Sequence, residues 1–215
     1  SDLGYKRWWL KHIPRTNTKV NGMDGNWWNY IIHIGPGQSS TTGTVNRIIL
    51  AGADDADSSC TLQLGNNEVY IGGTIASCTT PLIAALRFNK VNIPKNAKIK
   101  NAYIEFTTDG PYSNALSLNI YADNSDNSAP LSSGLTRPLT ASAVPFAITT
   151  NWVYDTQAKT PSLTPIVQEI INRPGWVSGN SMTILMKYVS GTGQRRFYGF
   201  ERNQNRAAKL IIEYE

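Results

Sequence analysis

The chain has 215 residues, enough for one large domain or two small ones, and 40% of them are hydrophobic, which suffices for a core. Only 16% are charged, and neutral polar residues, among them 20 Asn, take the place of charge. This balance excludes a coiled coil and a charge-rich disordered chain, and no apolar run reaches the roughly 18 residues that cross a membrane. We therefore expect a folded protein without a membrane span.

Residues 1–45 differ from the rest of the chain in charge and composition. They hold five basic residues against two acidic ones, so most of the net charge of +5 lies here and the remainder is nearly neutral. The run 35–43 consists of turn formers and closes the region. We interpret residues 1–45 as an N-terminal arm with a linker and residues 46–215 as the main domain. Because the charge excess is confined to the arm, we expect no nucleic-acid partner.

The arm contains four of the six tryptophans, in two adjacent pairs. The pairs are Trp8–Trp9 and Trp27–Trp28, and Tyr30 follows closely. Neighbouring residues on a strand point to opposite faces, so each pair places one ring on either side. One ring can then pack on the main domain while the other meets a sugar face or another chain. The alternative is that all four rings pack in a core.

Aspartates cluster in two segments that follow the arm. Carboxylate oxygens are the ligands that calcium prefers, although neither segment matches an EF-hand loop. Clustered carboxylates repel one another unless a cation or a basic partner intervenes, but Asp is also common in plain turns. A structural Ca²⁺ is thus one interpretation and ordinary turns the other. The candidate ligands are Asp54, Asp55, Asp57, Asp123 and Asp126.

The only two cysteines, Cys60 and Cys78, form an even pair with 17 residues between them. This spacing suits a bridge between neighbouring strands or across a loop, which would stabilise the fold by about 3 kcal/mol. A disulfide implies an oxidising compartment. The chain begins at Ser1 without an initiator Met, which favours a processed form. We expect a secreted or cell-surface protein, with two buried thiols as the alternative.

Short strand-like segments separated by turn signals fill the main domain. Period-2 alternation is clearest around Ala102, Ile104 and Phe106, and again at Leu116 and Leu118. Helical crossovers between the strands are missing, so the pattern predicts an antiparallel β-sandwich of the jelly-roll kind rather than a parallel sheet. The expected strands are 48–51, 69–71, 82–88, 99–107, 116–122, 182–189 and 210–215.

One segment breaks the strand pattern and predicts a single short helix. Ser162 stands as a cap before it, Pro165 falls in its first turn, and Pro174 stops it. Apolar residues recur at helical spacing, which predicts a structural helix that plugs one end of the sandwich. These residues are Leu163, Ile166, Val167, Ile170 and Ile171.

A run of arginines and aromatic residues lies near the C-terminus. It combines Arg195, Arg196, Arg202 and Arg206 with Phe197, Tyr198 and Phe200. This mixture is used on single-stranded nucleic acids and on acidic glycans. On a strand, Arg195 and Phe197 share one face while Arg196 and Tyr198 share the other. We take Arg195, Arg196 and Tyr198 as candidate ligand or partner contacts, with solvated arginines as the alternative.

Three widely separated stretches resemble one family of modules. They are 86–107, with its Ile-Pro-x-x-Ala-x-Ile turn, 165–181, with its helix and Pro-Gly-Trp turn, and the closing strand 207–214. Together they resemble a carbohydrate-binding-module-like β-sandwich that is an accessory of secreted bacterial surface and carbohydrate-active proteins. The resemblance frames residues 46–215 and implies a β-sandwich at the cell surface.

Motifs that carry catalysis are missing from the sequence. His12 and His33 lie in the arm outside any metal-ligand spacing, and there is neither a nucleophile elbow nor a phosphate loop. We therefore expect a non-catalytic protein that binds a polysaccharide or cell-surface glycan. The alternative is a structural subunit of an extracellular filament or layer, which polymerises when its arm adds a strand, such as 29–34, to the sheet edge of another copy.

Overall fold

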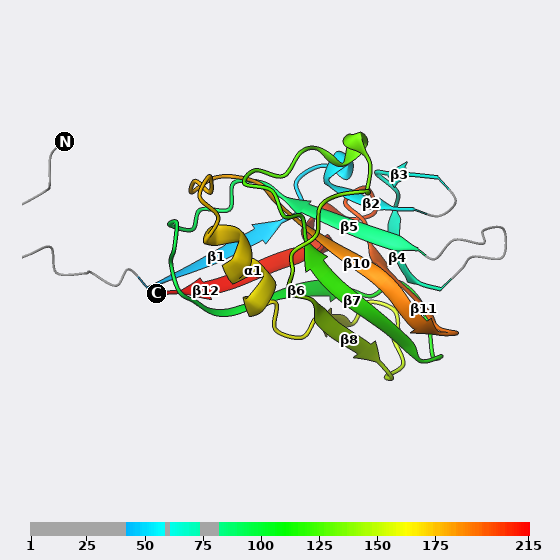
Figure 1. The fold of residues 1–215 in the computed structure, drawn as a ribbon. Coiled ribbons are helices and arrows are strands. Elements are labelled where there is room, and N and C mark those ends of the chain that lie inside the picture. The colour runs from blue at the N-terminus through cyan, green and yellow to red at the C-terminus, as the bar shows by residue number, and fades with distance from the viewer. Residues whose placement is uncertain (1–41, 59–60, 74–81) are drawn as a thin grey trace, which may run out of the picture. The chain divides into compact units, whose positions relative to one another are not determined.

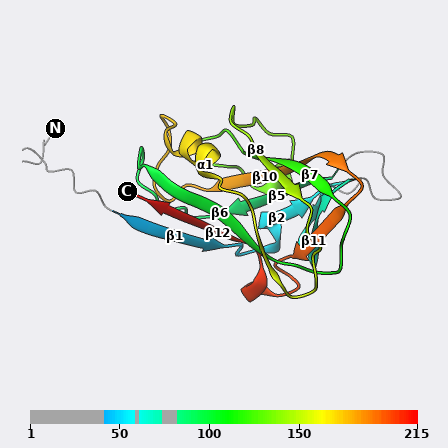
Figure 2. The ribbon, with the colours of Figure 1, turned by 90° about the horizontal axis from the view of Figure 1, so that it is seen from below.

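The computed structural model describes residues 42–58, 61–73 and 82–215. These residues form an all-β sandwich of antiparallel sheets with one short α-helix, as the sequence predicts. In Figure 1 the strands run diagonally across the molecule, and Figure 2 shows the two layers from below.

The first layer is a four-stranded sheet that contains the chain's closing strand. Its order is β1 (Gly43–Ile48), β12 (Lys209–Tyr214), β6 (Ile99–Thr107) and β9 (Gln157–Lys159). The second layer has six strands in the order β3 (Gln63–Leu64), β2 (Asp55–Asp57), β5 (Ile83–Phe88), β10 (Met182–Gly191), β7 (Leu116–Ala122) and β8 (Val144–Ile148). A two-stranded ribbon pairs β11 (Gln194–Tyr198) with β4 (Glu68–Gly72).

The core lies between the layers, where alternate residues of each strand meet. On β6, Ala102, Ile104 and Phe106 are buried while Tyr103 and Glu105 are partly exposed, which confirms the alternation expected from the sequence. On β7, Leu116, Leu118, Ile120 and Ala122 are buried in the same way. Burial of such side chains supplies most of the free energy that holds the two sheets together.

Helix α1 (Thr164–Ile171) packs against β6 and β7 and adds its buried face to this core. It is shorter than the segment 162–174 that the caps suggest. Leu163 stands at the N-cap instead of Ser162, whose hydroxyl bonds that of Thr164 at 2.9 Å. Trp176, just after the helix, is buried and donates its indole N–H to the carbonyl of Ile93 at 3.1 Å.

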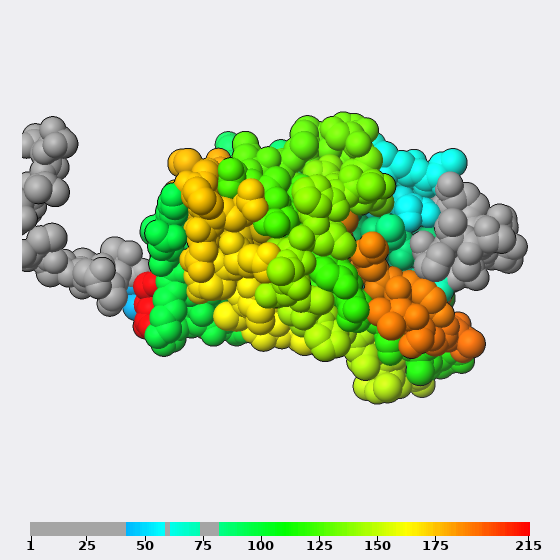
Figure 3. Space-filling view, viewed as in Figure 1, coloured from blue at the N-terminus to red at the C-terminus, as the bar shows by residue number. Residues whose placement is uncertain are grey.

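The outer face of the six-stranded sheet is also covered. Leu185 of β10 and Ala85 of β5 pack there against Leu131, which belongs to the long connection between β7 and β8. In the space-filling view of Figure 3 this connection, in green to yellow-green, and the yellow helix cover the face toward the viewer. The sheet is thus buried on both faces over these strands.

The structure corrects the first expected strand. β1 spans Gly43–Ile48 instead of 48–51, so the sandwich begins two residues before Val45 rather than after it. Pairing with β12 recruits residues 43–45, which belong to the linker expected from the sequence. The short strands β2, β3 and β9 are too brief to show alternation in the sequence, and β8, which does alternate between buried and exposed residues, is not among the expected strands. Within the described ranges, no helix has the length and apolarity needed to cross a bilayer.

Candidate functional site

The ribbon of β4 and β11 has an apolar inner face and a polar outer face. Phe197 points inward and packs against Phe106 with ring centroids 4.6 Å apart. Arg196 lies opposite Tyr70 in the register, and Tyr198 lies opposite Glu68. Because strand side chains alternate, these four residues share the outer face. The ribbon is thereby anchored in the core while it presents arginine and tyrosine outward.

Loops from distant parts of the chain extend this outer face. We call the combined feature the Arg–Tyr surface and define it by Tyr70, Tyr112, Tyr154, Arg196, Tyr198, Arg202 and Arg206. Tyr154 is its most open ring, with 51% of the residue exposed. Large planar side chains that are held by a ribbon and by the loops beside it form a preorganised platform, since their contacts with Arg196 leave little side-chain entropy to be lost on binding.

Arg196 holds the tyrosines of this surface in place. Its guanidinium lies 6.0 Å from the ring centroid of Tyr70 and 5.7 Å from that of Tyr112. It also donates to the hydroxyls of Tyr70 at 3.2 Å and Tyr154 at 3.4 Å. Burial alone lowers the pKa of Arg196, but the Tyr70 hydrogen bond and the neighbouring acidic groups outweigh it and raise this pKa above its usual range. The guanidinium stays charged.

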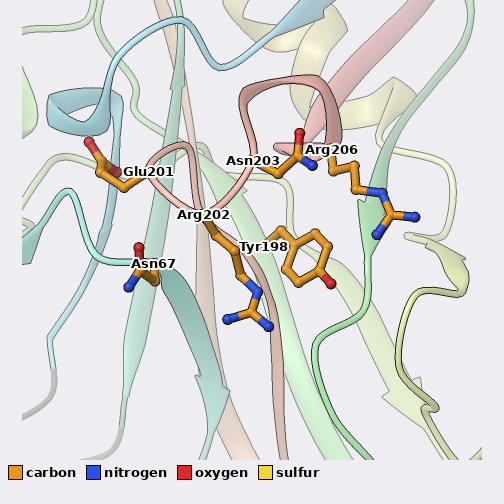
Figure 4. A pocket seen from close by; sticks show the side chains of 6 residues that line it. All are labelled: Asn67, Tyr198, Glu201, Arg202, Asn203 and Arg206. Atoms are coloured by element: carbon orange, nitrogen blue, oxygen red, sulfur yellow. The ribbon is translucent and has the colours of Figure 1, made fainter.

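Tyr198 lies between two further arginines, beside a hollow of about 420 Å³. The guanidinium of Arg202 is 4.8 Å from the ring centroid and that of Arg206 is 5.4 Å away, as Figure 4 illustrates. Only 7% of Tyr198 is exposed, so its ring supports the two cations and offers little surface to a ligand. The hollow is lined by Asn67, Tyr198, Glu201, Arg202, Asn203 and Arg206.

Two aspartates form ion pairs with these arginines. Asp109 is fully buried, and its carboxylate lies 3.3 Å from Arg202 and 3.9 Å from Arg196. Asp155 adopts the left-handed backbone conformation with φ of 60°, accepts a hydrogen bond from the hydroxyl of Tyr198, and pairs with Arg206 at 2.6 Å. The Tyr198 hydrogen bond and then the charge of Arg206 hold the pKa of Asp155 below its usual range.

The candidate contact residues on β11 lie on opposite faces of the strand, as the alternation predicts, and the two faces have different roles. Arg195 has no exposed surface, because it points inward with Phe197 and donates to the carbonyls of Asn114 at 2.9 Å and Thr150 at 3.0 Å. Burial lowers its pKa. Arg195 is therefore a structural residue and not a surface contact. Arg196 and Tyr198 belong to the Arg–Tyr surface.

Three aspartates of the two acidic segments form ion pairs with arginine side chains. Within the described residues, no three carboxylate, histidine or cysteine side chains gather as a metal site requires. Asp57 accepts a hydrogen bond from the backbone N–H of Tyr70 at 3.2 Å. The three remaining pairs are Asp54–Arg87 at 2.9 Å, Asp123–Arg137 at 2.8 Å and Asp126–Arg173 at 2.8 Å. Arginine guanidinium groups thus compensate the negative charge of Asp54, Asp123 and Asp126.

We expect chelation of divalent cations to leave the stability of the protein unchanged. A cation that binds only the folded state would raise the melting temperature by mass action, and its removal would lower it. Melting curves recorded with excess EDTA and with millimolar CaCl₂ should therefore coincide within about 1 °C. A melt that falls by several degrees in EDTA and recovers with Ca²⁺ would restore the calcium interpretation.

Asp55 is the exception among the acidic residues. It is 1% exposed, and one carboxylate oxygen accepts the backbone N–H of Phe200 at 2.7 Å, while the other has no hydrogen-bond partner within the described residues. Burial raises the pKa of Asp55 to about 7, the Phe200 hydrogen bond opposes the shift, and the charges of Glu201, Asp54 and Asp57 add to it. Asp55 thus anchors the backbone just before the hollow.

The remaining sequence-based candidates lie outside the described residues. They are the arm aromatics Trp8, Trp9, Trp27, Trp28 and Tyr30 and the cysteines Cys60 and Cys78. The glycan contacts of the arm and the disulfide stay predictions.

Sequence reasoning missed three tyrosines of the site. Tyr70, Tyr112 and Tyr154 come from β4 and from two loops, and all three surround Arg196. Each stands alone in a segment without a motif, so no local signal links it to β11. Comparison with known proteins adds no assignment, since no family model matches the chain and no curated protein is similar to it.

Proposed function

We propose that the protein is a secreted, non-catalytic module that binds a polysaccharide or cell-surface glycan through the Arg–Tyr surface. The observation that carries this proposal is the array of planar side chains around Arg196 and Tyr198, held by a core-anchored ribbon and its neighbouring loops beside a hollow of about 420 Å³. Sugar faces pack on aromatic rings, and sugar hydroxyls bond to amide and guanidinium groups. The resemblance of residues 46–215 to a carbohydrate-binding module supports the same ligand class.

The structural contacts of two glutamates support the non-catalytic part of this proposal. A glycosidase needs two carboxyl groups that face each other across a substrate site. Glu105 instead pairs with Lys159 at 2.9 Å, and Glu169 accepts the backbone N–H groups of Ala141 and Ser142 at 2.7 and 3.0 Å. Secretion is proposed from the resemblance and from the expected Cys60–Cys78 disulfide.

Two substitutions on the Arg–Tyr surface test this function. Tyr154→Ala removes the most exposed ring, and Arg202→Gln removes a guanidinium at the hollow; we expect each to weaken binding to a responsive polysaccharide about tenfold. Affinity electrophoresis and titration calorimetry across a polysaccharide panel provide the measurement. Tyr103→Ala is the matched control, because Tyr103 lies on the outer face of β6 and outside the surface.

The contrary outcome is equally clear. If no polysaccharide binds the wild-type protein, or if the Tyr103 variant loses as much affinity as the two site variants, the proposed site is wrong.

A second candidate function is assembly through the N-terminal arm. A groove of about 230 Å³ lies between β8 and β9, which are the edges of the two sheets within the described chain. It is flanked by two strands that each have one unpaired side, the arrangement to which an extended segment can add. An arm strand such as 29–34 from a neighbouring copy is the proposed occupant. Fibres that disappear when residues 1–35 are deleted, together with no glycan binding, would favour this function.

A further inference from the structure

The arginines of the Arg–Tyr surface lie among carboxylates that neighbouring residues supply. Its three guanidinium groups belong to Arg196, Arg202 and Arg206. The carboxylates in contact with these groups or in the wall of the hollow are Glu68, Asp109, Asp155 and Glu201. Three guanidinium groups thus lie beside four carboxylates, of which Asp109 is fully buried, so within the described ranges these arginines have no excess of positive charge.

We infer that the glycan bound by this surface is neutral where it makes contact and presents hydroxyl groups rather than carboxylate, sulfate or phosphate. This inference rests on the proposed function and specifies its ligand class.

Each of these arginines already forms an ion pair with a carboxylate of the protein. Arg202 pairs with Glu68 at 3.2 Å and with Asp109 at 3.3 Å. Arg206 pairs with Asp155 at 2.6 Å. An anionic sugar would have to displace these carboxylates or lie beside them, and like charges at short range reject a ligand. The ion pairs therefore orient the remaining N–H donors without attracting anions.

The wall of the hollow combines these donors with acceptors. Among the described residues, the Glu201 carboxylate and the Asn67 side chain have no hydrogen-bond partner, and both residues line the same hollow as Arg202 and Arg206, although Figure 4 shows the Glu201 carboxylate turned away from the two guanidinium groups. A sugar hydroxyl donates one hydrogen bond and accepts others, so a polyol satisfies both kinds of group at once. A carboxylate or sulfate only accepts, and it would leave Glu201 facing a second negative charge.

The experiment compares neutral and anionic polymers on the full chain. The neutral probes are laminarin, a galactomannan and a xyloglucan, and the anionic probes are polygalacturonate, alginate and heparin, each titrated at about 20 and 300 mM NaCl. We expect at least one neutral polymer to bind with an affinity that changes less than about twofold between the two salt concentrations. Anionic polymers should bind at least about tenfold more weakly.

A substitution of the acceptor sharpens the test. Glu201→Gln replaces a charged acceptor with a neutral one, and we expect it to weaken binding of the neutral polymer about tenfold. Glu213→Gln makes the same charge change on an exposed residue of β12 and should leave binding unaltered. If Glu201→Gln and Glu213→Gln weakened binding of the neutral polymer equally, the effect would come from the net charge of the protein and not from an acceptor in the hollow.

Two failures can be told apart. Tight binding of an anionic polymer that weakens in salt and is lost in Arg202→Gln would overturn the neutral-ligand inference and retain glycan binding at this surface. No binding of any polymer, neutral or anionic, would overturn both proposals.

Discussion

Replacement of Asp55 with Asn is expected to stabilise the protein at pH 8 and to leave its stability almost unchanged at pH 4. Asp55 is buried, and the folded state raises its pKa to about 7 from 3.8. At a pH between these two pKa values, the folded state binds more protons than the unfolded state, so the free energy of unfolding falls as pH rises. Asn carries no charge at any pH and avoids this loss.

The size of the effect follows from the shift in pKa. Each unit corresponds to about 1.4 kcal/mol, so a shift of about three units amounts to about 4 kcal/mol at full ionisation. Asn also retains a carbonyl oxygen that accepts the backbone N–H of Phe200, the hydrogen bond that Asp55 makes at 2.7 Å. Urea unfolding at pH 4, 6 and 8 measures the change, and its slope against pH should flatten in the variant.

Asp155→Asn provides a control of opposite sign. The pKa of Asp155 is held low by Tyr198 and Arg206, so its ionised form stabilises the folded state above the unfolded pKa, and this contribution is lost as pH falls through the lowered pKa. The variant should therefore be less stable than the wild type at pH 8. If Asp55→Asn is no more stable than the wild type at pH 8, Asp55 is not ionised against its burial and the account is wrong.

Replacement of Arg137 with Met is expected to cost about 3–5 kcal/mol of stability. Arg137 lies within the connection between β7 and β8 and pairs with the buried Asp123, with side-chain exposures of 6% and 3%. Its guanidinium also donates to the carbonyls of Gly134, Ala129 and Pro130 at 2.7–3.1 Å. Without it, the buried Asp123 carboxylate keeps its hydrogen bond from Ser128 but loses its counter-charge, and this buried unpaired charge is the main origin of the penalty.

Two further variants separate charge from packing. Asp123→Asn in the Arg137→Met background should recover part of the loss, because it removes the unpaired buried charge. Arg173→Met breaks a more exposed pair with Asp126, at 28% and 42% side-chain exposure, and should cost at most about 1 kcal/mol. Thermal and urea unfolding provide the values. A loss in Arg137→Met that is no larger than in Arg173→Met would contradict this explanation.

The expected strands that the structure confirms best are the longest ones with strict alternation. β6 and β7 fall where the sequence places them, residue for residue, because each has one face in the core and one toward solvent. β10 is also close to its expected bounds, although it is buried on both faces over its first half. Edge strands such as β1 and β9 were misplaced or missed, since a short polar strand owes its conformation to the neighbour that it pairs with.

The amino-acid sequence by itself determined the all-β sandwich, its helix and the alternation that divides β11 into two faces, because period-2 and helical patterns are local properties of the chain. Tertiary structure alone decided that Arg195 is buried while Arg196 is not. It also decided that arginines form ion pairs with the clustered aspartates, and that Tyr112 and Tyr154 contact Arg196. Tyr154 and Arg196 are 42 residues apart and Tyr70 and Arg196 are 126 apart. Contacts over such separations depend on how the sheets and loops come together, and no pattern within one segment encodes them.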